Sequence, residues 1–201
     1  MKLDTSKWQS FELRELFDIG TGAICKAKDL RDGDTPRISV KGVNNGIQGY
    51  FKDIDSKDYR TIENFISFSF LGTCFYHPYK ASLDMKVHSL KPKNYKLNTF
   101  SGLFLVNVLR KSFKGVYDNQ ISSTDLKQEK ILLPTIAKDK PDWEFMENCI
   151  KKSKKDIEKL LTIYRALDST GGGGVKSLLI LLLALLLAKR NEILYKGLLW
   201  K

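Results

Sequence analysis

With 201 residues, of which 42% are hydrophobic and 11% aromatic, the chain can build one domain of ordinary size and an appendage. Its three cysteines, Cys25, Cys74 and Cys149, are far apart and lack CxxC spacing, which argues against a disulfide framework or a zinc site and favours reduced thiols. The net charge of +11 makes a polyanion one candidate partner, and the N-terminus shows no export signal, so we expect a cytoplasmic protein.

Residues 8–134 have the composition of short strands and turns, because glycines recur throughout this segment. Asn45-Gly46 predicts a tight hairpin turn, since both residues tolerate positive φ, and the flanking strands are expected at residues 36–40 and 47–51. Residues 65–70 alternate between apolar and polar side chains, as a half-buried strand does.

Two further apolar segments follow in this part of the chain. Residues 103–109 form an apolar run that fits either a buried strand or a buried helix, and periodicity does not decide between them. Residues 130–133 predict a last strand, which Pro134 ends. The pattern as a whole predicts the α/β (α+β) class, with a β-rich domain over residues 1–140.

The positive charge is concentrated between residues 80 and 114. This stretch holds eight basic residues and one acidic residue, whereas acids and bases balance over residues 1–79 and over residues 115–140. A polyanion partner favours such clustering, because each neutralised phosphate releases condensed counterions; a solvated lysine surface is the alternative. The expected phosphate-binding residues are Lys80, Lys86, Lys91, Lys93, Lys96, Arg110, Lys111 and Lys114.

Sequence-specific reading of DNA requires amides, guanidinium groups or hydroxyls on exposed loops, where they reach base edges. The candidates of these types are Arg37, Lys41, Asn44, Asn45, Gln48, Tyr79, Asn119 and Gln120. For each of them the alternative is turn chemistry or surface solvation, and for Asn44 and Asn45 turn formation is the favoured interpretation.

The pattern changes at Pro141, which together with Asp142 predicts the start of a helix with Asp142 as its N-cap. Apolar residues then follow at alternating spacings of three and four, which is an a/d heptad register with one polar interruption at Ser153. This narrow seam favours a partner helix, including a homodimer, over packing of the helix on its own β domain. The residues expected to face the partner are Trp143, Met146, Ile150, Ile157, Leu160, Tyr164 and Leu167.

A glycine run at residues 171–174 ends this spacer or dimerisation helix, which we place at residues 141–169. Beyond it, residues 178–188 are all apolar and predict a second helix within a C-terminal segment, residues 170–201. Eleven residues make a helix of about 16 Å, too short for the ~30 Å hydrocarbon core of a bilayer, so no membrane span is expected. We expect this helix to pack in a hairpin with the first or in a bundle with another subunit.

The sequence lacks a recognisable catalytic constellation. It has two histidines, His77 and His88, and no nucleophile elbow, Walker loop or Rossmann glycine pattern. The Asp-x-Lys triplets at residues 84–86 and 125–127 have no Pro-Asp upstream, which a metal-dependent nuclease of that type requires. Cys74 and His77 lack a second pair of metal ligands. We therefore expect no enzyme activity, no metal and no cofactor in this chain.

Six segments, in the same order, resemble the target-recognition domain of the specificity (S) subunit of type I restriction-modification systems and related type II enzymes. They are WQSFELRELFDIGTG at residues 8–22, GDTPRIS at 33–39, NGIQGYF at 45–51, ISFSFLGTCFY at 66–76, LKQEKILLP at 126–134 and PDWEFME at 141–147. Each motif is weak alone, but the ordered set extends over residues 8–147, about 70% of the chain. The residues from the glycine run onward match no motif of that family.

The resemblance implies a recognition domain that binds double-stranded DNA, with a long helix that acts as spacer and docking surface. It also implies a DNA methyltransferase subunit as partner, to which S-adenosylmethionine, Mg²⁺ and ATP would belong. Because the chain has one recognition domain and one such helix, it resembles half of a specificity subunit. Two other classes stay open on the residues alone: a β-rich adaptor that assembles through its C-terminal helices without DNA, and a membrane-surface protein anchored by residues 178–188.

Overall fold

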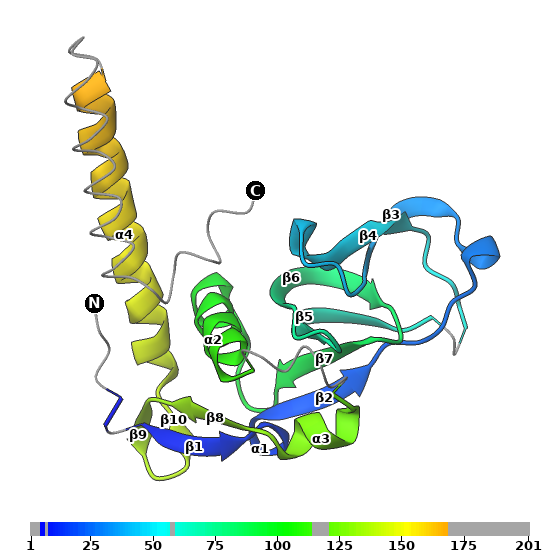
Figure 1. Ribbon diagram of the computed structural model, residues 1–201, viewed down its shortest axis with the longest axis horizontal. Coiled ribbons are helices and arrows are strands. Elements are labelled where there is room, and N and C mark those ends of the chain that lie inside the picture. The colour runs from blue at the N-terminus through cyan, green and yellow to red at the C-terminus, as the bar shows by residue number, and fades with distance from the viewer. Residues whose placement is uncertain (1–4, 7, 57–58, 114–120, 169–201) are drawn as a thin grey trace.

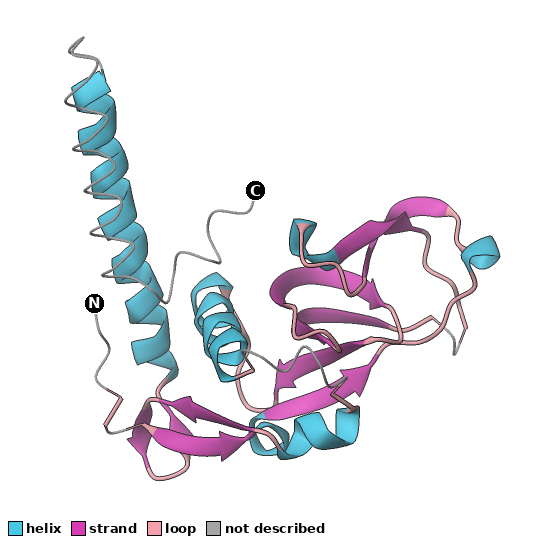
Figure 2. Ribbon diagram, viewed as in Figure 1, coloured by secondary structure: helices cyan, strands magenta, loops and turns pink. Residues whose placement is uncertain are grey.

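The computed structural model describes residues 5–6, 8–56, 59–113 and 121–168, and within the last helix it leaves out the side chains of Tyr164, Ala166, Leu167 and Asp168. Lys114, Asn119, Gln120 and the glycine run with the apolar segment after it therefore lie outside the described residues. The predicted fold class is confirmed, since a mixed α/β body with β-rich sheets precedes a long C-terminal helix (Figure 2).

A six-stranded sheet forms the centre of the β-rich domain, which is the expected recognition domain. Its strands lie in the order β2-β7-β5-β6-β3-β4, and every neighbouring pair is antiparallel except β3 and β6. The strands are β2 (Phe17–Thr21), β3 (Asp32–Ile38), β4 (Ile47–Phe51), β5 (Thr61–Ser69), β6 (Cys74–Leu83) and β7 (Val87–Pro92).

The sheet curls, so that the residues just after its edge strand β2 reach the end of β6. The amide of Gly22 continues the pairing of β2 with β7 by donating to the carbonyl of Val87 at 3.0 Å, and the amide of Ala23 crosses to β6 and donates to the carbonyl of Leu83 at 3.2 Å. Arg60, just before β5, adds a side-chain hydrogen bond to the carbonyl of Thr21 at 2.9 Å. These bonds satisfy backbone groups that an open sheet edge would leave unpaired.

Smaller elements surround this sheet. The strand predicted at residues 130–133 is confirmed as β8, which pairs with the first strand, β1, so that the two ends of the recognition domain meet. The remaining elements are β1 (Gln9–Glu12), β8 (Lys130–Leu133), the short pair β9 (Thr135–Ala137) and β10 (Lys140–Pro141), the helices α1 (Leu13–Leu16) and α3 (Ser123–Gln128), and the 3-10 turns η1 (Ala27–Asp29) and η2 (Asn44–Gly46).

The ambiguous apolar run at residues 103–109 is a helix, α2 (Thr99–Ser112). Asn98 caps it, because the Asn98 side-chain oxygen accepts from the amides of Phe100 at 2.9 Å and Ser101 at 3.1 Å. One face of the helix packs on the sheet, and its buried residues share a core with Ile66, Phe68 and Leu90. Figure 1 shows α2 between the sheet and the base of the long helix.

Two expectations for the strands need correction. Residues 65–69 of β5 are all buried, so the strand is covered on both faces there and is not half-buried. Its second face packs in a separate cluster that joins Phe65 to Ile38, Ile47, Ala81, Leu83 and Val87. The predicted hairpin forms between β3 and β4, but Ile38 pairs with Ile47 and leaves residues 39–46 as a longer connection. Asn44, Asn45 and Gly46 all have positive φ, at 49°, 50° and 75°, as their turn-forming character predicts.

The long helix α4 (Trp143–Asp168) starts where the sequence predicts. The Asp142 carboxylate accepts from the amide of Phe145 at 2.8 Å, so the predicted N-cap is confirmed. The predicted partner helix is wrong for the first part of the seam, because Trp143, Met146 and Ile150 pack into the core of the recognition domain itself. Beyond Ser153 the helix projects away from that domain (Figure 1).

The distal part of α4 carries apolar side chains in contact with solvent. Ile157 and Leu160 of the seam are half-buried. Leu161 and Ile163 are 48% and 49% exposed. No helix within the described residues has the length and hydrophobicity needed to cross a bilayer.

Candidate nucleic-acid interface

Three connections between strands lie side by side and form what we call the loop surface: residues 39–46, 70–73 and 84–86. The amide of Phe70 donates to the carbonyl of Lys86 at 3.0 Å, which joins the turn after β5 to the turn after β6. A Cβ on Gly42 would lie 3.7 Å from Cγ2 of Thr73, so the connection between β3 and β4 reaches the same place. Segments that are far apart in the sequence thus present one surface.

Local hydrogen bonds hold each turn of the loop surface in one shape. The Ser69 hydroxyl accepts from the amide of Leu71 at 3.2 Å and from both the amide and the hydroxyl of Thr73, at 3.1 Å and 2.7 Å. The Asp84 carboxylate accepts from the amide of Lys86 at 3.1 Å. Bonds from side chain to backbone replace sheet pairing in such turns, so side chains on the loop surface project from a defined backbone.

The exposed side chains of the loop surface combine cations, amides and apolar groups. Lys41, Asn44, Asn45 and Lys86 are exposed. Lysine ammonium groups suit DNA phosphates, and asparagine amides can pair with adenine edges. The apolar members are Val43, Leu71 and Met85, at 53%, 41% and 38% exposed. The sequence did not predict these three residues as part of the site. An apolar side chain is expected to be buried, and only the fold shows that these turns leave theirs exposed.

Arg37 corrects the sequence-based expectation for base reading. Its side chain is 1% exposed, donates to the carbonyl of Ala23 at 3.1 Å and pairs with the Asp84 carboxylate at 3.6 Å. A buried guanidinium paired in this way supports the fold from below the loop surface and does not reach a base.

Three predicted phosphate ligands are engaged within the protein. The Arg110 guanidinium donates to the carbonyl of Cys74 at 3.0 Å and 2.6 Å and lies 4.9 Å above the ring of Phe75, so it ties α2 to β6. Lys80 pairs with Asp53, and this hydrogen bond raises the pKa of Lys80 and lowers that of Asp53. Lys93 donates to the carbonyl of Arg14 at 2.7 Å.

The remaining predicted ligands do not gather into one patch. Lys91 lies on β7 opposite Asp18 of β2, Lys96 precedes α2, and Lys111 lies near the end of α2; all three lysines are exposed. Gln48 is exposed on β4, next to the loop surface in sequence. The compact basic stretch of the sequence is therefore spread over several parts of the fold, and Lys86 is its member on the loop surface.

Tyr79 belongs to a row of hydrogen-bonded polar side chains next to the apolar cluster around Phe65 and Ile38. Its hydroxyl lies 3.2 Å from Nδ1 of His77, and Nε2 of the same ring lies 2.8 Å from the Ser67 hydroxyl. Burial lowers the pKa of His77 to about 3, so the ring is neutral near pH 7. Both ring nitrogens have protein partners, while Cys74 packs on the other face under α2. Among the described residues, no group of three or more His, Cys, Asp or Glu could hold a metal ion.

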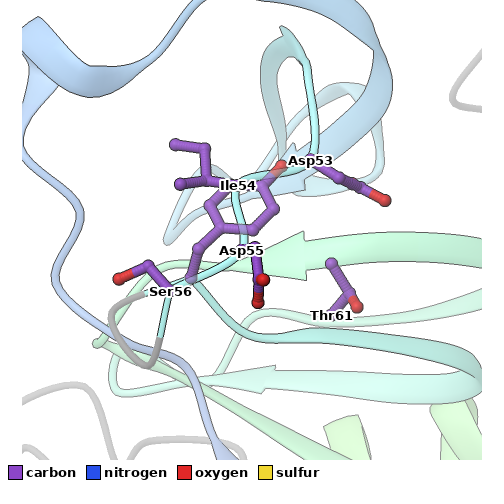
Figure 3. A pocket seen from close by; sticks show the side chains of 6 residues that line it. Asp53, Ile54, Asp55, Ser56 and Thr61 are labelled. Carbon is purple, nitrogen blue, oxygen red and sulfur yellow. The ribbon is translucent and has the colours of Figure 1, made fainter.

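A separate opening lies near the start of β5 (Figure 3). It has a volume of about 390 Å³ and is lined by Asp53, Ile54, Asp55, Ser56, Tyr59 and Thr61. The lining holds two carboxylates, of which Asp53 pairs with Lys80, and no cationic side chain that would attract phosphate groups. The opening thus has the wrong charge for the DNA backbone, and the loop surface is the better candidate.

A family of known proteins matches most of this chain. The model of the type I restriction modification DNA specificity domain matches residues 5–162. The chain belongs to this family. The expected resemblance is thereby confirmed. A curated relative, the specificity subunit S.BcgI of the type II restriction enzyme BgcI from Heyndrickxia coagulans, is 33% identical over 154 residues, which are 75% of this chain and 44% of that protein.

Solved structures of specificity subunits have the same fold as this specificity domain. The HsdS subunit from Thermoanaerobacter tengcongensis matches with a TM-score of 0.57 at 14% identity, over 96% of this chain and 46% of that one. A structure from a study of complex assembly in a type I restriction-modification system matches with a TM-score of 0.53 at 17% identity, over 94% of this chain and 46% of that one. The chain thus spans less than half the length of these relatives.

Proposed function

We propose that this chain is a sequence-specific DNA-binding unit that directs a restriction-modification enzyme to its target and performs no catalysis itself. The observation that carries the proposal is the loop surface, which exposes Lys41 and Lys86 together with the amides of Asn44 and Asn45 on hydrogen-bonded turns. Cations position a protein on the phosphates, and amides discriminate bases. Membership of a DNA specificity family supports the same assignment.

The partner in this proposal is a DNA methyltransferase subunit. The curated relative is the specificity subunit of a restriction enzyme, and one structural neighbour comes from work on the assembly of such a system. The catalytic cofactors, S-adenosylmethionine with Mg²⁺ and ATP where the system uses them, would be bound by partner subunits. The complex would act in the cytoplasm, where host and invading DNA meet.

The second recognition unit would come from another copy of the chain. The distal part of α4 offers Ile157, Leu160, Leu161 and Ile163 to a partner helix, since these side chains are half-buried or exposed. Two copies joined through α4 would hold their loop surfaces at opposite ends of a helical spacer. Two-fold symmetry of the protein would then be mirrored in the DNA as an interrupted palindrome.

Selection from a pool of random duplexes tests this function. The full chain is immobilised, and bound 40-base-pair duplexes are recovered and sequenced over several rounds. The proposal predicts enrichment of two short sequences separated by a constant number of unspecified base pairs. Enrichment of a single continuous, asymmetric sequence would contradict the homodimer and keep the recognition function. Recovery of no sequence at all at low salt would leave a DNA-free adaptor as the better account.

A further inference from the structure

We propose that Glu147 is a positioning residue: it fixes the angle at which α4 leaves the recognition domain and, through that angle, the spacing between two half-sites. The first part concerns this chain alone, and the part about spacing rests on the proposed function. The carboxylate lies on the first turns of α4 and contacts the segment that leads into α2. It therefore connects the helix that would set the spacing to the domain that would read the bases.

The Glu147 carboxylate collects three donors. Its Oε1 accepts from the Tyr95 hydroxyl at 2.5 Å and from the Asn98 amide at 2.7 Å, and its Oε2 accepts from the Lys151 ammonium at 2.9 Å. These bonds lower the pKa of Glu147 to about 2, with Lys151 as the largest cause, so the group is ionised across the neutral range. An ionised acceptor forms stronger hydrogen bonds than a neutral one.

Further contacts around these donors link α4 to the segment that leads into α2. The amide nitrogen of Asn98 donates to Glu147, while its side-chain oxygen caps α2. The ring of Tyr95 stacks on that of Trp143, with centroids 4.2 Å apart and planes 4° from parallel. Lys151 also lies 5.4 Å above the ring of Phe100 in the first turn of α2. Glu147 thus joins the N-terminal ends of α2 and α4 through directional contacts.

Apolar packing alone defines the angle between α4 and the domain less well than the hydrogen bonds of Glu147 do. Met146 and Ile150 are buried against the domain, but hydrophobic burial is non-directional and tolerates a small rocking motion of one helix on another. Hydrogen bonds weaken steeply as their geometry departs from linearity. The contacts of Glu147 therefore resist a tilt that the two apolar side chains would allow.

The length of α4 amplifies any tilt at its base. Ser153 is the last buried residue among those of α4 whose side chains the structure describes, and the helix continues to Asp168. At a rise of 1.5 Å per residue this distal part is about 22 Å long. A tilt of roughly 10° would displace its end by about 4 Å, more than the 3.4 Å rise of one base pair. A loose base would therefore permit adjacent half-site spacings.

A distance measurement on the free protein tests the first part. Spin labels are attached at Lys159→Cys on α4 and Lys91→Cys on β7, two exposed positions, in a Cys25→Ser and Cys149→Ala background. Cys74 stays in place, because it is buried and its thiol pKa is raised to about 12 by desolvation. We expect Glu147→Ala to broaden the distance distribution at least twofold. Glu147→Gln, which keeps an oxygen acceptor, should broaden it less.

A matched control is available on the same helix. Glu158→Ala removes another i,i+4 pair, with Lys154 at 3.7 Å, but this pair is exposed and makes no contact with the domain in the described structure. Its distribution should equal that of the wild type. If Glu147→Ala does not fold, Tyr95→Phe removes a single donor and should broaden the distribution modestly. A folded Glu147→Ala or Tyr95→Phe protein with the wild-type distribution would overturn the proposal.

The second part of the proposal, the link between Glu147 and the half-site spacing, is tested by selecting DNA from a random pool. The wild type should recover one half-site spacing, and Glu147→Ala should recover the same half-site bases at two or more adjacent spacings. A merely destabilised domain would weaken binding without changing the spacing. If Glu147→Ala selects one spacing, unchanged from that of the wild type, Glu147 does not determine the half-site spacing. If the wild type itself selects no DNA, the proposed function is contradicted, and the result of the distance measurement still stands.

Discussion

Replacing Gly102 with alanine should destabilise the protein, although alanine is the better helix former. Gly102 lies in the first turns of α2, where the gain in helix propensity is at most about 1 kcal/mol. A Cβ at this position would lie 2.5 Å from Cγ of Tyr76 and 2.7 Å and 2.8 Å from its two Cδ atoms. Carbon atoms in contact prefer about 3.5–4.0 Å, so α2 would have to move about 1 Å away from β6.

The cost of that movement decides whether the substitution stabilises or destabilises the protein. Phe104, Leu105 and Leu109 of α2 are all buried in the same core, so a displaced helix loosens their packing as well. Inserting a methyl group into a well-packed core typically costs ~1–3 kcal/mol. Because this exceeds the propensity gain, we expect Gly102→Ala to lower the free energy of unfolding by about 1–2 kcal/mol.

Urea denaturation followed by circular dichroism measures this difference. The variant should show a lower midpoint with an unchanged slope. In a Tyr76→Ala background the obstructing ring is absent, so the same substitution should become neutral or stabilising. If Gly102→Ala is as stable as the wild type while Tyr76 is present, α2 does not pack on β6 at the distance described, and the reasoning fails.

Two further outcomes follow from the site. Burial lowers the pKa of His77 to about 3, below its unfolded value of 6.5, so protonation favours the unfolded state. The free energy of unfolding should therefore fall as the pH drops below about 6.5, by up to ~1.4 kcal/mol per pH unit. In denaturant titrations between pH 7 and 4, the free energy of unfolding of His77→Gln should depend less on pH than that of the wild type. Lys41→Ala combined with Lys86→Ala should lower the salt dependence of duplex binding by up to about two counterions, each with a slope near −0.9. Lys80→Ala, whose ammonium already pairs with Asp53, is the control, and a larger effect of the control would move the DNA-binding face away from the loop surface.

Local sequence signals predicted the parts of the fold that depend on neighbouring residues. The cap at Asp142 formed as expected, because it requires only a few adjacent residues. Asn44 to Gly46 have the positive φ values of a turn, although the connection between the two strands is longer than the predicted hairpin turn. The ordered motifs predicted the family, since they retain the spacing of several elements at once. The run at residues 103–109 stayed ambiguous, because a helix buried along much of its length loses its amphipathic period.

Long-range contacts account for what the sequence did not predict. Arg37 looked like an exposed reader, but its partners Ala23 and Asp84 are brought to it by the curl of the sheet. The heptad seam of α4 indicated a partner helix, yet a helix period does not reveal whether the partner is another chain or the chain's own α2. The loop surface likewise depends on three turns that are more than 10 residues apart in sequence, which a linear pattern does not place together.

The central claim is that this chain reads DNA sequence, and the affinity ratio between a selected and a scrambled duplex tests it most directly. Both duplexes have the same length and composition, and fluorescence anisotropy gives the dissociation constant of each at two salt concentrations. The account predicts that the selected duplex binds at least 10³-fold more tightly, as specific DNA-binding proteins typically do. The salt dependence of the weaker complex should remain that of phosphate contacts. Equal affinities for the two duplexes would contradict the account.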